Sequence, residues 1–386
     1  MQKQLQNLTI LFFLLISCWA KAQDMAEITV DESLPPVTVE ETEAAEEEAE
    51  EEDAKFTLSG SADAYFRVST NDQAPASSFA NLPGFSLGMF NLIGTHEGKK
   101  AGFVGDLVFG PRGGDAVFAS GVPTIGDGFA ANASTFVNQL YVYWNASENV
   151  TLTLGNFNTF LGYEVISPVG NFNYSTSYMF SYGPFSHTGL KADFGLGEDL
   201  SLMLGVFNPT DLTEANVIGS YSMGAQLGYK GVFLNLLYGD QDGDFEGSAG
   251  PLFQVDLTAG FDVTEDLYVG INATMNSFEP TEGSDRPGFY GLAGYFQYAL
   301  SETVALGLRG EYFGENNGGY GILGAYDIDA SASVIDLTLS GNINLGNLTL
   351  IPEIRLDSAS EDVFLDGDGK ATSSLASFVL AGVYGF

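Results

Sequence analysis

The 386-residue sequence has very few of the residues from which active centres are usually built. It contains one cysteine and two histidines, His96 and His187. Ser186 adjoins His187, but neighbours on a strand point to opposite faces, so the pair does not predict a catalytic set. Because an enzyme needs a nucleophile, a base or a metal site, this scarcity argues against catalysis. It also argues against a dedicated transition-metal site.

Basic residues and long apolar runs are scarce as well. There are 13 lysines and arginines against 50 acids, and the net charge of −37 argues against a nucleic-acid partner. No glycine-rich loop stands between a predicted strand and a helix, so nucleotide binding has no support. The one long apolar run, 8–19, is shorter than the roughly 20 residues of a spanning helix. A mature chain that crosses a membrane must therefore do so as a closed barrel.

The N-terminus has the pattern of a secretory signal. Lys3 precedes the apolar run, and Ala20-Lys21-Ala22 is a small-x-small cleavage site, so we predict a signal peptide over 1–22. Cys18 follows Leu15-Ile16-Ser17, which also fits the box before a lipidated cysteine. Lipidation of Cys18 and its removal with the signal both stay open; removal leaves a mature chain without a thiol.

Residues 23–54 form a separate acidic segment. Positions 24–53 carry 14 acids and no base, and they include Pro35-Pro36. A segment that repels itself and buries nothing is expected to be disordered. We predict a periplasmic tail that is either simply solvated or docks a basic periplasmic partner protein.

From residue 55 to 386 the sequence is rich in glycine and aromatic residues and alternates with a period of two, which is typical of membrane strands. In 335–339, for example, Ile335, Leu337 and Leu339 alternate with Asp336 and Thr338. About sixteen such segments occur, and we predict a transmembrane antiparallel β-barrel of 14–18 strands. The predicted strands start near Phe56, Phe85, Ala101, Thr135, Val150, His187, Leu200, Ser220, Val232, Leu252, Leu267, Gly288, Val304, Ser333, Leu348 and Leu375.

The connections between these segments alternate in length. The short ones are 97–100, 145–149, 195–199, 230–231, 262–266, 301–303 and 346–347. The long ones are roughly 70–83, 110–133, 161–186, 209–219, 239–251, 277–287, 315–331 and 359–374. Short periplasmic turns and long outer loops are the arrangement of outer-membrane barrels. An even strand number then places both ends of the barrel on the periplasmic side.

The C-terminal segment carries Phe378, Leu380, Gly382, Tyr384 and Phe386 on one face. A terminal phenylalanine in phase with an aromatic residue two positions earlier resembles the signal that the bacterial barrel-assembly machinery reads. We therefore predict Tyr384 and Phe386 to be an assembly signal and part of an aromatic girdle.

Twelve charged residues fall on the face opposite the lipid. Arg or Lys on the lipid face would cost about 2–4 kcal/mol near the membrane midplane, so an inward position is expected whatever the function. Two interpretations stay open: ion pairs that brace the wall, or a charged water-filled pore. The predicted pore-lining residues are Asp63, Arg67, Asp106, Lys191, Asp193, Asp256, Arg309, Glu311, Asp336, Glu353, Arg355 and Asp357.

The third long connection, 161–186, is unusually aromatic. Seven exposed aromatic side chains would form an apolar patch, so we predict that this loop folds into the barrel mouth and constricts the pore. The predicted constriction residues are Tyr163, Glu164, Phe172, Tyr174, Tyr178, Phe180, Tyr182 and Phe185. With Asp106 and Asp193 nearby, we expect a preference for cations.

Two acidic loop tips invite comparison with calcium sites. Residues 240–251 begin like an EF-hand loop, but Phe245 replaces the sixth-position glycine and Pro251 the twelfth-position glutamate, so the motif fails. Weak Ca²⁺ binding there or at 366–369 stays an alternative to solvated acidic tips. The loops are also expected to share divalent ions with lipopolysaccharide. We predict no cofactor.

One stretch carries more than a strand pattern. Gly155-Asn156-Phe157-Asn158-Thr159-Phe160 is followed by Gly162-Tyr163-Glu164, 171–175 (Asn-Phe-Asn-Tyr-Ser), Gly183-Pro184-Phe185 and His187-Thr188-Gly189. These roughly 40 residues resemble the OmpL-like β-barrel porins, a family common in the Bacteroidetes. The resemblance implies an outer-membrane porin and no established substrate. The alternative function is an accessory barrel of a larger assembly, docked through the acidic tail; the oligomeric state is open.

Overall fold

The computed structural model describes residues 55–70, 72–118, 135–243, 250–279, 287–316 and 332–386. The predicted signal peptide and acidic tail lie outside these residues. Parts of four long connections, 119–134, 244–249, 280–286 and 317–331, lie outside them as well.

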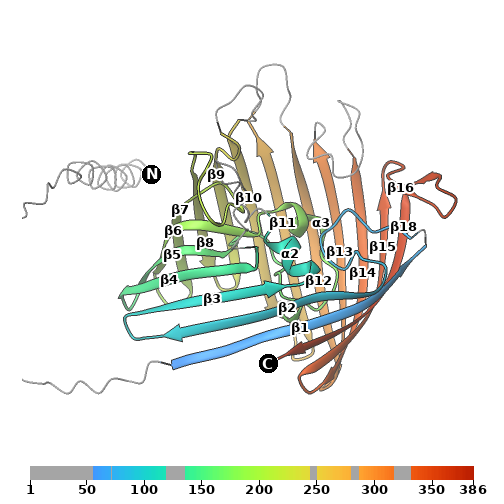
Figure 1. The fold of residues 1–386 in the computed structure, drawn as a ribbon, viewed down its shortest axis with the longest axis horizontal. Coiled ribbons are helices and arrows are strands. Elements are labelled where there is room, and N and C mark those ends of the chain that lie inside the picture. The colour runs from blue at the N-terminus through green and yellow to red at the C-terminus, as the bar shows by residue number, and fades with distance from the viewer. Residues whose placement is uncertain (1–54, 71, 119–134, 244–249, 280–286, 317–331) are drawn as a thin grey trace, which may run out of the picture. The chain divides into compact units, whose positions relative to one another are not determined.

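Sixteen antiparallel strands form a closed barrel (Figure 1), which confirms the predicted fold. They follow one another around the barrel in chain order, and β1 closes it against β18. Each begins within two residues of its predicted start. The strands are β1 (Lys55–Ser69), β2 (Gly84–Glu97), β3 (Ala101–Phe109), β4 (Val137–Ser147), β5 (Val150–Asn158), β6 (Ser186–Gly195), β7 (Leu200–Phe207), β8 (Ser222–Tyr229), β9 (Val232–Gly239), β10 (Leu252–Asp262), β11 (Leu267–Phe278), β12 (Gly288–Ser301), β13 (Val304–Asn316), β14 (Ser333–Leu345), β15 (Leu348–Ala359) and β18 (Ser374–Gly385).

Only short elements lie outside the barrel wall in the described part of the chain. Helix α2 (Pro111–Ala116) follows β3, and the 3-10 turn η1 (Pro168–Gly170) and helix α3 (Tyr178–Tyr182) lie between β5 and β6. A two-stranded hairpin, β16 (Phe364–Leu365) and β17 (Ala371–Thr372), stands in the last long loop. No described helix is long and apolar enough to cross a membrane.

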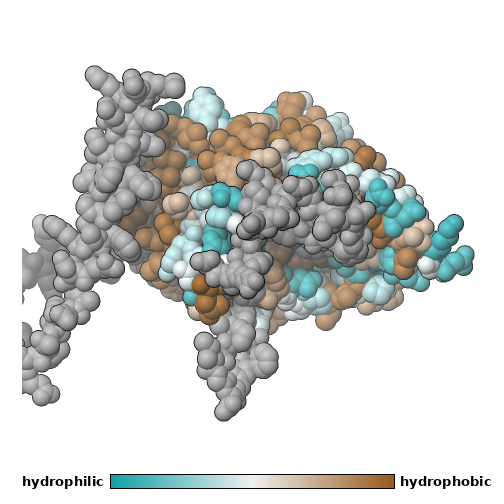
Figure 2. Space-filling model, turned by 90° about the horizontal axis from the view of Figure 1, so that it is seen from above, coloured by the Kyte–Doolittle hydropathy of each residue, from teal (hydrophilic) through white to brown (hydrophobic). Residues whose placement is uncertain are grey.

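The alternating sequence pattern sorts side chains to the two faces of the wall. In β14, Ile335, Leu337 and Leu339 are about half exposed on the outside, whereas Asp336 and Thr338 are fully buried inside. In the space-filling view, hydrophobic residues occupy much of the visible circumference (Figure 2). Because lipid solvates such an apolar surface, the exposed side chains mark the membrane face rather than a defect of packing.

The connections confirm the predicted alternation of short turns and long loops. One of the two-residue turns, Lys230-Gly231 between β8 and β9, has φ of 49° and 79°. Two successive positive φ angles match the type I′ turn, whose twist suits a two-residue hairpin.

The last residue takes part in barrel closure. The backbone N–H and carbonyl of Phe386 each make a 3.0 Å hydrogen bond to Gly60 of β1. Tyr384 and Phe386 both point outward and are about half exposed, as the sequence predicts for a girdle at the membrane edge.

The lumen and the loop that fills it

The connection between β5 and β6 does not extend outward. Residues 159–185, here called the inner loop, run through the interior of the barrel and carry η1 and α3 (Figure 1). Tyr174 and Tyr178 are at most 1% exposed, and Phe180 and Phe185 are also buried. Tyr163, Phe172 and Tyr182 are partly buried.

Two wall glutamates bind the inner loop through its backbone. Glu353 of β15 accepts hydrogen bonds from the N–H groups of Tyr174 and Ser175, at 2.7 and 3.0 Å. Glu311 of β13 accepts from Tyr178 and Met179, at 2.7 and 2.8 Å. Hydrogen bonds to a charged acceptor are stronger than neutral ones. The two carboxylates therefore hold the loop at points four residues apart.

Two wall arginines bind the same segment from the carbonyl side. Arg309 donates to the carbonyl of Ser175 at 2.6 Å and pairs with Glu164 of the loop at 2.7 Å and with Asp336 of β14 at 2.7 Å. Its side chain is fully buried.

Arg355 of β15 makes the equivalent contacts one residue further along the loop. It donates to the carbonyl of Thr176 at 2.8 Å and pairs with Asp357 at 2.8 Å. Removing one partner of such a buried network leaves an uncompensated charge, which is strongly destabilising.

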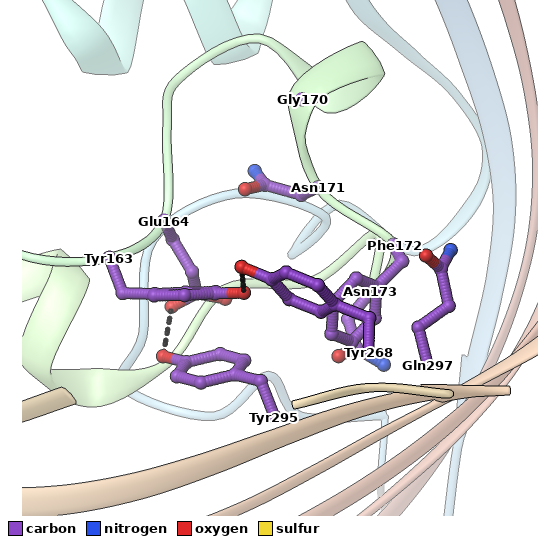
Figure 3. A pocket seen from close by; sticks show the side chains of 9 residues that line it. All are labelled: Tyr163, Glu164, Gly170, Asn171, Phe172, Asn173, Tyr268, Tyr295 and Gln297. Carbon is purple, nitrogen blue, oxygen red and sulfur yellow. Dashed lines mark hydrogen bonds between the residues drawn. The ribbon is translucent and has the colours of Figure 1, made fainter. Parts of the chain in front are cut away.

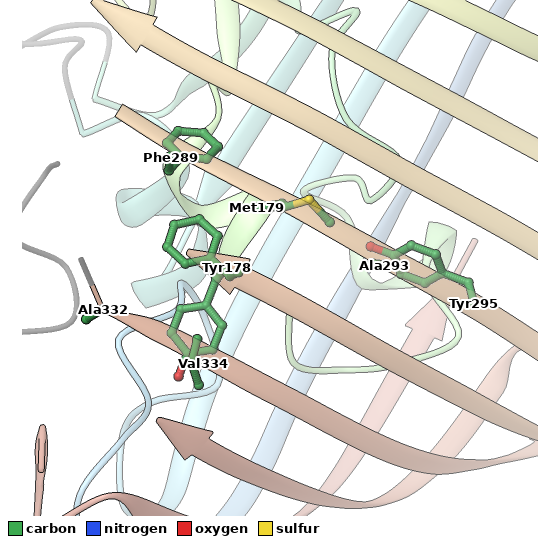
Figure 4. Close-up of a cluster of buried hydrophobic side chains, with 8 residues drawn as sticks. Tyr178, Met179, Phe289, Ala293, Tyr295, Ala332 and Val334 are labelled. Carbon is green, nitrogen blue, oxygen red and sulfur yellow. The ribbon is translucent and has the colours of Figure 1, made fainter. Parts of the chain in front are cut away.

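Aromatic packing completes the attachment. Tyr178 and Met179 form a buried cluster with Phe289 of β12 (Figure 4). Phe313 of β13 belongs to the same cluster. The Tyr178 and Phe313 rings are stacked with centroids 5.7 Å apart. Burial raises the pKa of Tyr182 to about 12 and raises the pKa of Tyr174 as well. These phenols therefore stay protonated, and the Tyr174 hydroxyl donates to Asp63 of β1.

Glycines in the wall make room for the loop. A Cβ at Gly307 would lie 2.6 Å from Phe172 Cδ2, and one at Gly291 would lie 2.5 Å from the Met179 side chain. A larger residue at Gly307 would therefore displace the ring or backbone of Phe172, and one at Gly291 would force the Met179 side chain to move. The high glycine content therefore serves loop packing as well as sheet twist.

The inner loop reaches deeper than the mouth, which corrects the predicted position. At its tip, the carbonyl of Phe172 accepts from Asn342 of β14 at 2.9 Å. Val169 Cγ2 lies 3.6 Å from the Cβ position of Gly385, near the short-turn end of β18. The loop thus runs through most of the lumen because the wall offers partners along its whole length.

All twelve predicted pore-lining residues lie on the inward face, but most of them are buried from solvent. Ten of them are between 0 and 9% exposed. The remaining two, Lys191 and Asp193, pair with each other at 2.9 Å and have 24% and 41% of their side chains exposed. This geometry matches the bracing interpretation for the ten buried residues rather than a row of charges along open water.

The acids expected to attract cations are already engaged in ion pairs or hydrogen bonds with other residues of the chain. Glu164 and Asp193 are paired as described, and Asp106 accepts from Asn138 at 2.7 Å, from Gln139 at 3.0 Å and from Asn91. Asp256 of β10 is surrounded in the same way, by the amides of Asn235 and Asn272 at 2.8 and 2.6 Å and the N–H of Gly162 at 3.0 Å. Sequence reasoning missed these amide partners because only the sheet register shows that they face the carboxylates.

Beneath the loop, on the short-turn side, the lumen is hollow. One cavity of about 340 Å³ is bounded by Tyr163, Tyr268 and Tyr295 together with other loop and wall residues (Figure 3). A second cavity of about 470 Å³ shares Gly170, Asn171, Phe172 and Gln297 with the first and has no charged residue in its lining. The two cavities together are here called the vestibule. Their wall residues were not singled out from the sequence, where they appear only as ordinary inward positions.

Both histidines lie against aromatic rings. His187 is fully buried between Phe160 and Phe207, with ring centroids 4.9 and 5.1 Å away, and Nε2 lies 2.9 Å from Thr159 Oγ1. His96 stacks on Phe103 with centroids 5.6 Å apart. His187 Nδ1 has no hydrogen-bond partner among the described residues, so no carboxylate orients this ring there.

No group of three or more potential metal ligands occurs in the described ranges. At the two acidic tips, Asp240 and Asp366 accept backbone hydrogen bonds within their own turns. Asp244 lies outside the described residues, and weak Ca²⁺ binding stays a prediction.

Comparison with known proteins places this barrel among porins. A family model described as "Putative beta-barrel porin-2, OmpL-like" matches residues 55–386. No curated protein sequence matches the chain.

Solved structures share the fold at low identity. The anion-selective porin from Comamonas acidovorans is 13% identical with a TM-score of 0.56, over 86% of this chain and 100% of that one. The outer membrane channel DcaP of Acinetobacter baumannii is 13% identical with a TM-score of 0.54, over 86% and 97%. OmpT of Vibrio cholerae is 10% identical with a TM-score of 0.52, over 86% and 97%.

Proposed function

We propose a transport function from one premise: the chain belongs to the OmpL-like β-barrel porin family. It is a porin-like barrel of the outer membrane, and we infer that it forms a narrow, water-filled diffusion channel for small solutes. The observation that carries this is the inner loop, which crosses a sixteen-strand barrel wide enough for an aqueous channel. The loop held by Glu311 and Glu353 narrows that channel, and Ala76, Ser78 and Arg112 of α2 bind it from the neighbouring connections.

The preference for cations rests on the outer loops rather than on the wall. The seven long connections other than the inner loop contain 18 acids and three bases, whereas the seven short turns contain six acids and three bases. The long-loop side thus carries a net −15 and the short-turn side −3. Because a mouth of one sign concentrates counter-ions, cations should enter more readily than anions. The effect should fade as salt rises.

Planar-bilayer recording in a salt gradient tests both statements. We expect a moderate conductance and a cation-selective reversal potential at low salt. Shortening 165–182 should raise the conductance, because that segment lies in the lumen. An anion-selective reversal potential would refute the charge argument, and an unchanged conductance after shortening would refute the constriction.

A second candidate function is favoured by the tight bracing of the inner loop. Ten buried wall charges and a loop fixed on both sides suit an accessory barrel that does not conduct. In that case the acidic tail, which would be periplasmic because β1 begins on the short-turn side, would dock a basic partner. A barrel that is folded in the bilayer but silent would favour this candidate.

We also propose that the barrel has no catalytic role, and that it interacts with the barrel-assembly machinery and with lipopolysaccharide. Porin family membership and the buried setting of His187 support a channel rather than an enzyme. The exposed Tyr384 and Phe386 suit recognition by the barrel-assembly machinery. The acidic outer loops suit divalent ions shared with lipopolysaccharide.

A further inference from the structure

The vestibule beneath the inner loop differs in chemistry from the rest of the lumen. Elsewhere the inward face is crowded with charged residues, but here the one charged lining residue is Glu164, whose carboxylate is already held by Arg309 and by Ser177. The remaining lining consists of amides, hydroxyls, aromatic rings and small apolar residues. Such a surface offers hydrogen bonds and ring faces without net charge.

Two polar groups of the vestibule lack partners. Asn173 is 2% exposed; its amide nitrogen donates to Ser340 at 2.7 Å, but its Oδ1 has no hydrogen-bond partner among the described residues. Buried acceptors are normally satisfied, so this oxygen marks a place for a donor from outside the chain. The amide of Gln297, on β12, is also without a partner in the described part of the chain and rises toward Phe172 (Figure 3).

Aromatic rings form the other part of the wall. Tyr163 of the loop stacks on Tyr295 of β12 with centroids 4.1 Å apart, and its hydroxyl contacts that of Tyr268 of β11 at 3.0 Å. Phe172 meets Tyr295 edge-on at 6.3 Å. Rigid rings beside a free acceptor and a free amide suit a ligand with apolar C–H faces and hydroxyl edges.

We propose that the vestibule is a binding subsite for a neutral polyhydroxylated solute, a mono- or disaccharide, which passes the inner loop on its way through the channel. This rests on the proposed diffusion function and names the solute class for it. A sugar hydroxyl donates to Asn173 Oδ1, and the Gln297 amide both donates to and accepts from neighbouring hydroxyls. Volumes of about 340 and 470 Å³ lie in the usual range for small-molecule sites.

The test uses the folded full-length barrel in planar bilayers, with maltose added on both sides in 1 M salt. We expect concentration-dependent, reversible interruptions of the current. Gln297→Ala and Tyr268→Ala should each raise the half-blocking maltose concentration at least tenfold. The matched control is Thr151→Val, which alters a separate cavity of about 220 Å³ between β5 and β8 and should leave the block unchanged. The half-blocking concentration of glucose should be at least tenfold lower than that of gluconate, because the lining of the vestibule has no cationic side chain to pair with a carboxylate.

The outcomes separate this inference from the proposed function. If the barrel conducts but maltose does not block it, the subsite is overturned and the channel function is unaffected. The same holds if Gln297→Ala, Tyr268→Ala and Thr151→Val all leave the half-blocking maltose concentration unchanged. Block by gluconate at the same concentration as glucose also overturns the subsite. If no variant conducts, the channel function fails, and saturation-transfer NMR of maltose with the detergent-folded barrel decides about the subsite. A saturable signal weakened by Gln297→Ala supports it, and its absence overturns it.

Discussion

The attachment of the inner loop to the wall gives the sharpest prediction. Glu353 accepts two backbone hydrogen bonds from the loop, at 2.7 and 3.0 Å, and a third at 2.7 Å from Ser340 of the wall. Replacing it by alanine removes both loop contacts and leaves the N–H groups of Tyr174 and Ser175 without an acceptor. Two hydrogen bonds to a charged acceptor contribute roughly 3–6 kcal/mol.

The lost free energy determines how often the inner loop is detached from the wall, here called undocked. Since about 1.4 kcal/mol changes an equilibrium constant tenfold, Glu353→Ala should shift the docked-to-undocked ratio by roughly 10²–10⁴. Glu353→Gln keeps one carbonyl acceptor and should give an intermediate shift. Adding Glu311→Ala removes the second pair of contacts, at 2.7 and 2.8 Å, and should enlarge the effect.

Single-channel recording and limited proteolysis measure this directly. Glu353→Ala should show long-lived states of higher conductance and new cleavage sites within 159–185. Asp106→Asn is the control. The hydrogen-bond partners of Asp106 lie on β2 and β4, and none belongs to the inner loop. If Glu353→Ala and the double variant both fold and match the wild type in conductance and cleavage, the glutamates do not hold the loop and the reasoning is refuted.

Three further predictions concern assembly, the tail and pH. Deleting Phe386 removes both backbone bonds to Gly60 and the terminal aromatic, so heat-modifiable folded barrel in outer membranes should fall; wild-type amounts would contradict its role as a signal. Residues 24–53 should be cleaved by protease in periplasmic extracts while the barrel stays intact, and their deletion should leave heat-modifiability unchanged; a tail-less chain that fails to fold would show a structural role. Burial raises the pKa of Asp211, in the loop after β7, to about 6, against the lowering effect of the Phe185 and Ser186 N–H groups. Because the folded state then binds a proton that the unfolded state does not, this group makes folding more favourable as pH falls from about 6 toward 4. Asp211→Asn, which tolerates the φ of 65°, should flatten that part of the stability–pH curve measured by heat-modifiability; an unchanged slope would exclude Asp211 as its source.

The period of two in the sequence is by itself enough to predict the barrel. A strand whose alternate residues are apolar has one lipid face and one inward face, and the lipid environment then requires closure. For that reason, strands that the sequence predicts to start at Val150, Leu267 and Val304 begin at those residues in the structure. The turn lengths predict the orientation in the membrane, and the aromatic excess of 161–186 predicts that this loop folds inward.

The tertiary structure alone decided what the inward residues do. Alternation tells which face Arg309 or Glu353 occupies, but the partner of each depends on the register between strands far apart in sequence and on the path of the inner loop. The same holds for Asn173 and Gln297, which are 124 positions apart in the chain and meet at the vestibule only because the loop runs down to β12. Inward position is a local property of a strand and can be read along the chain. Whether an inward charge is buried in a network or faces water is a property of what fills the barrel, and no local pattern encodes it.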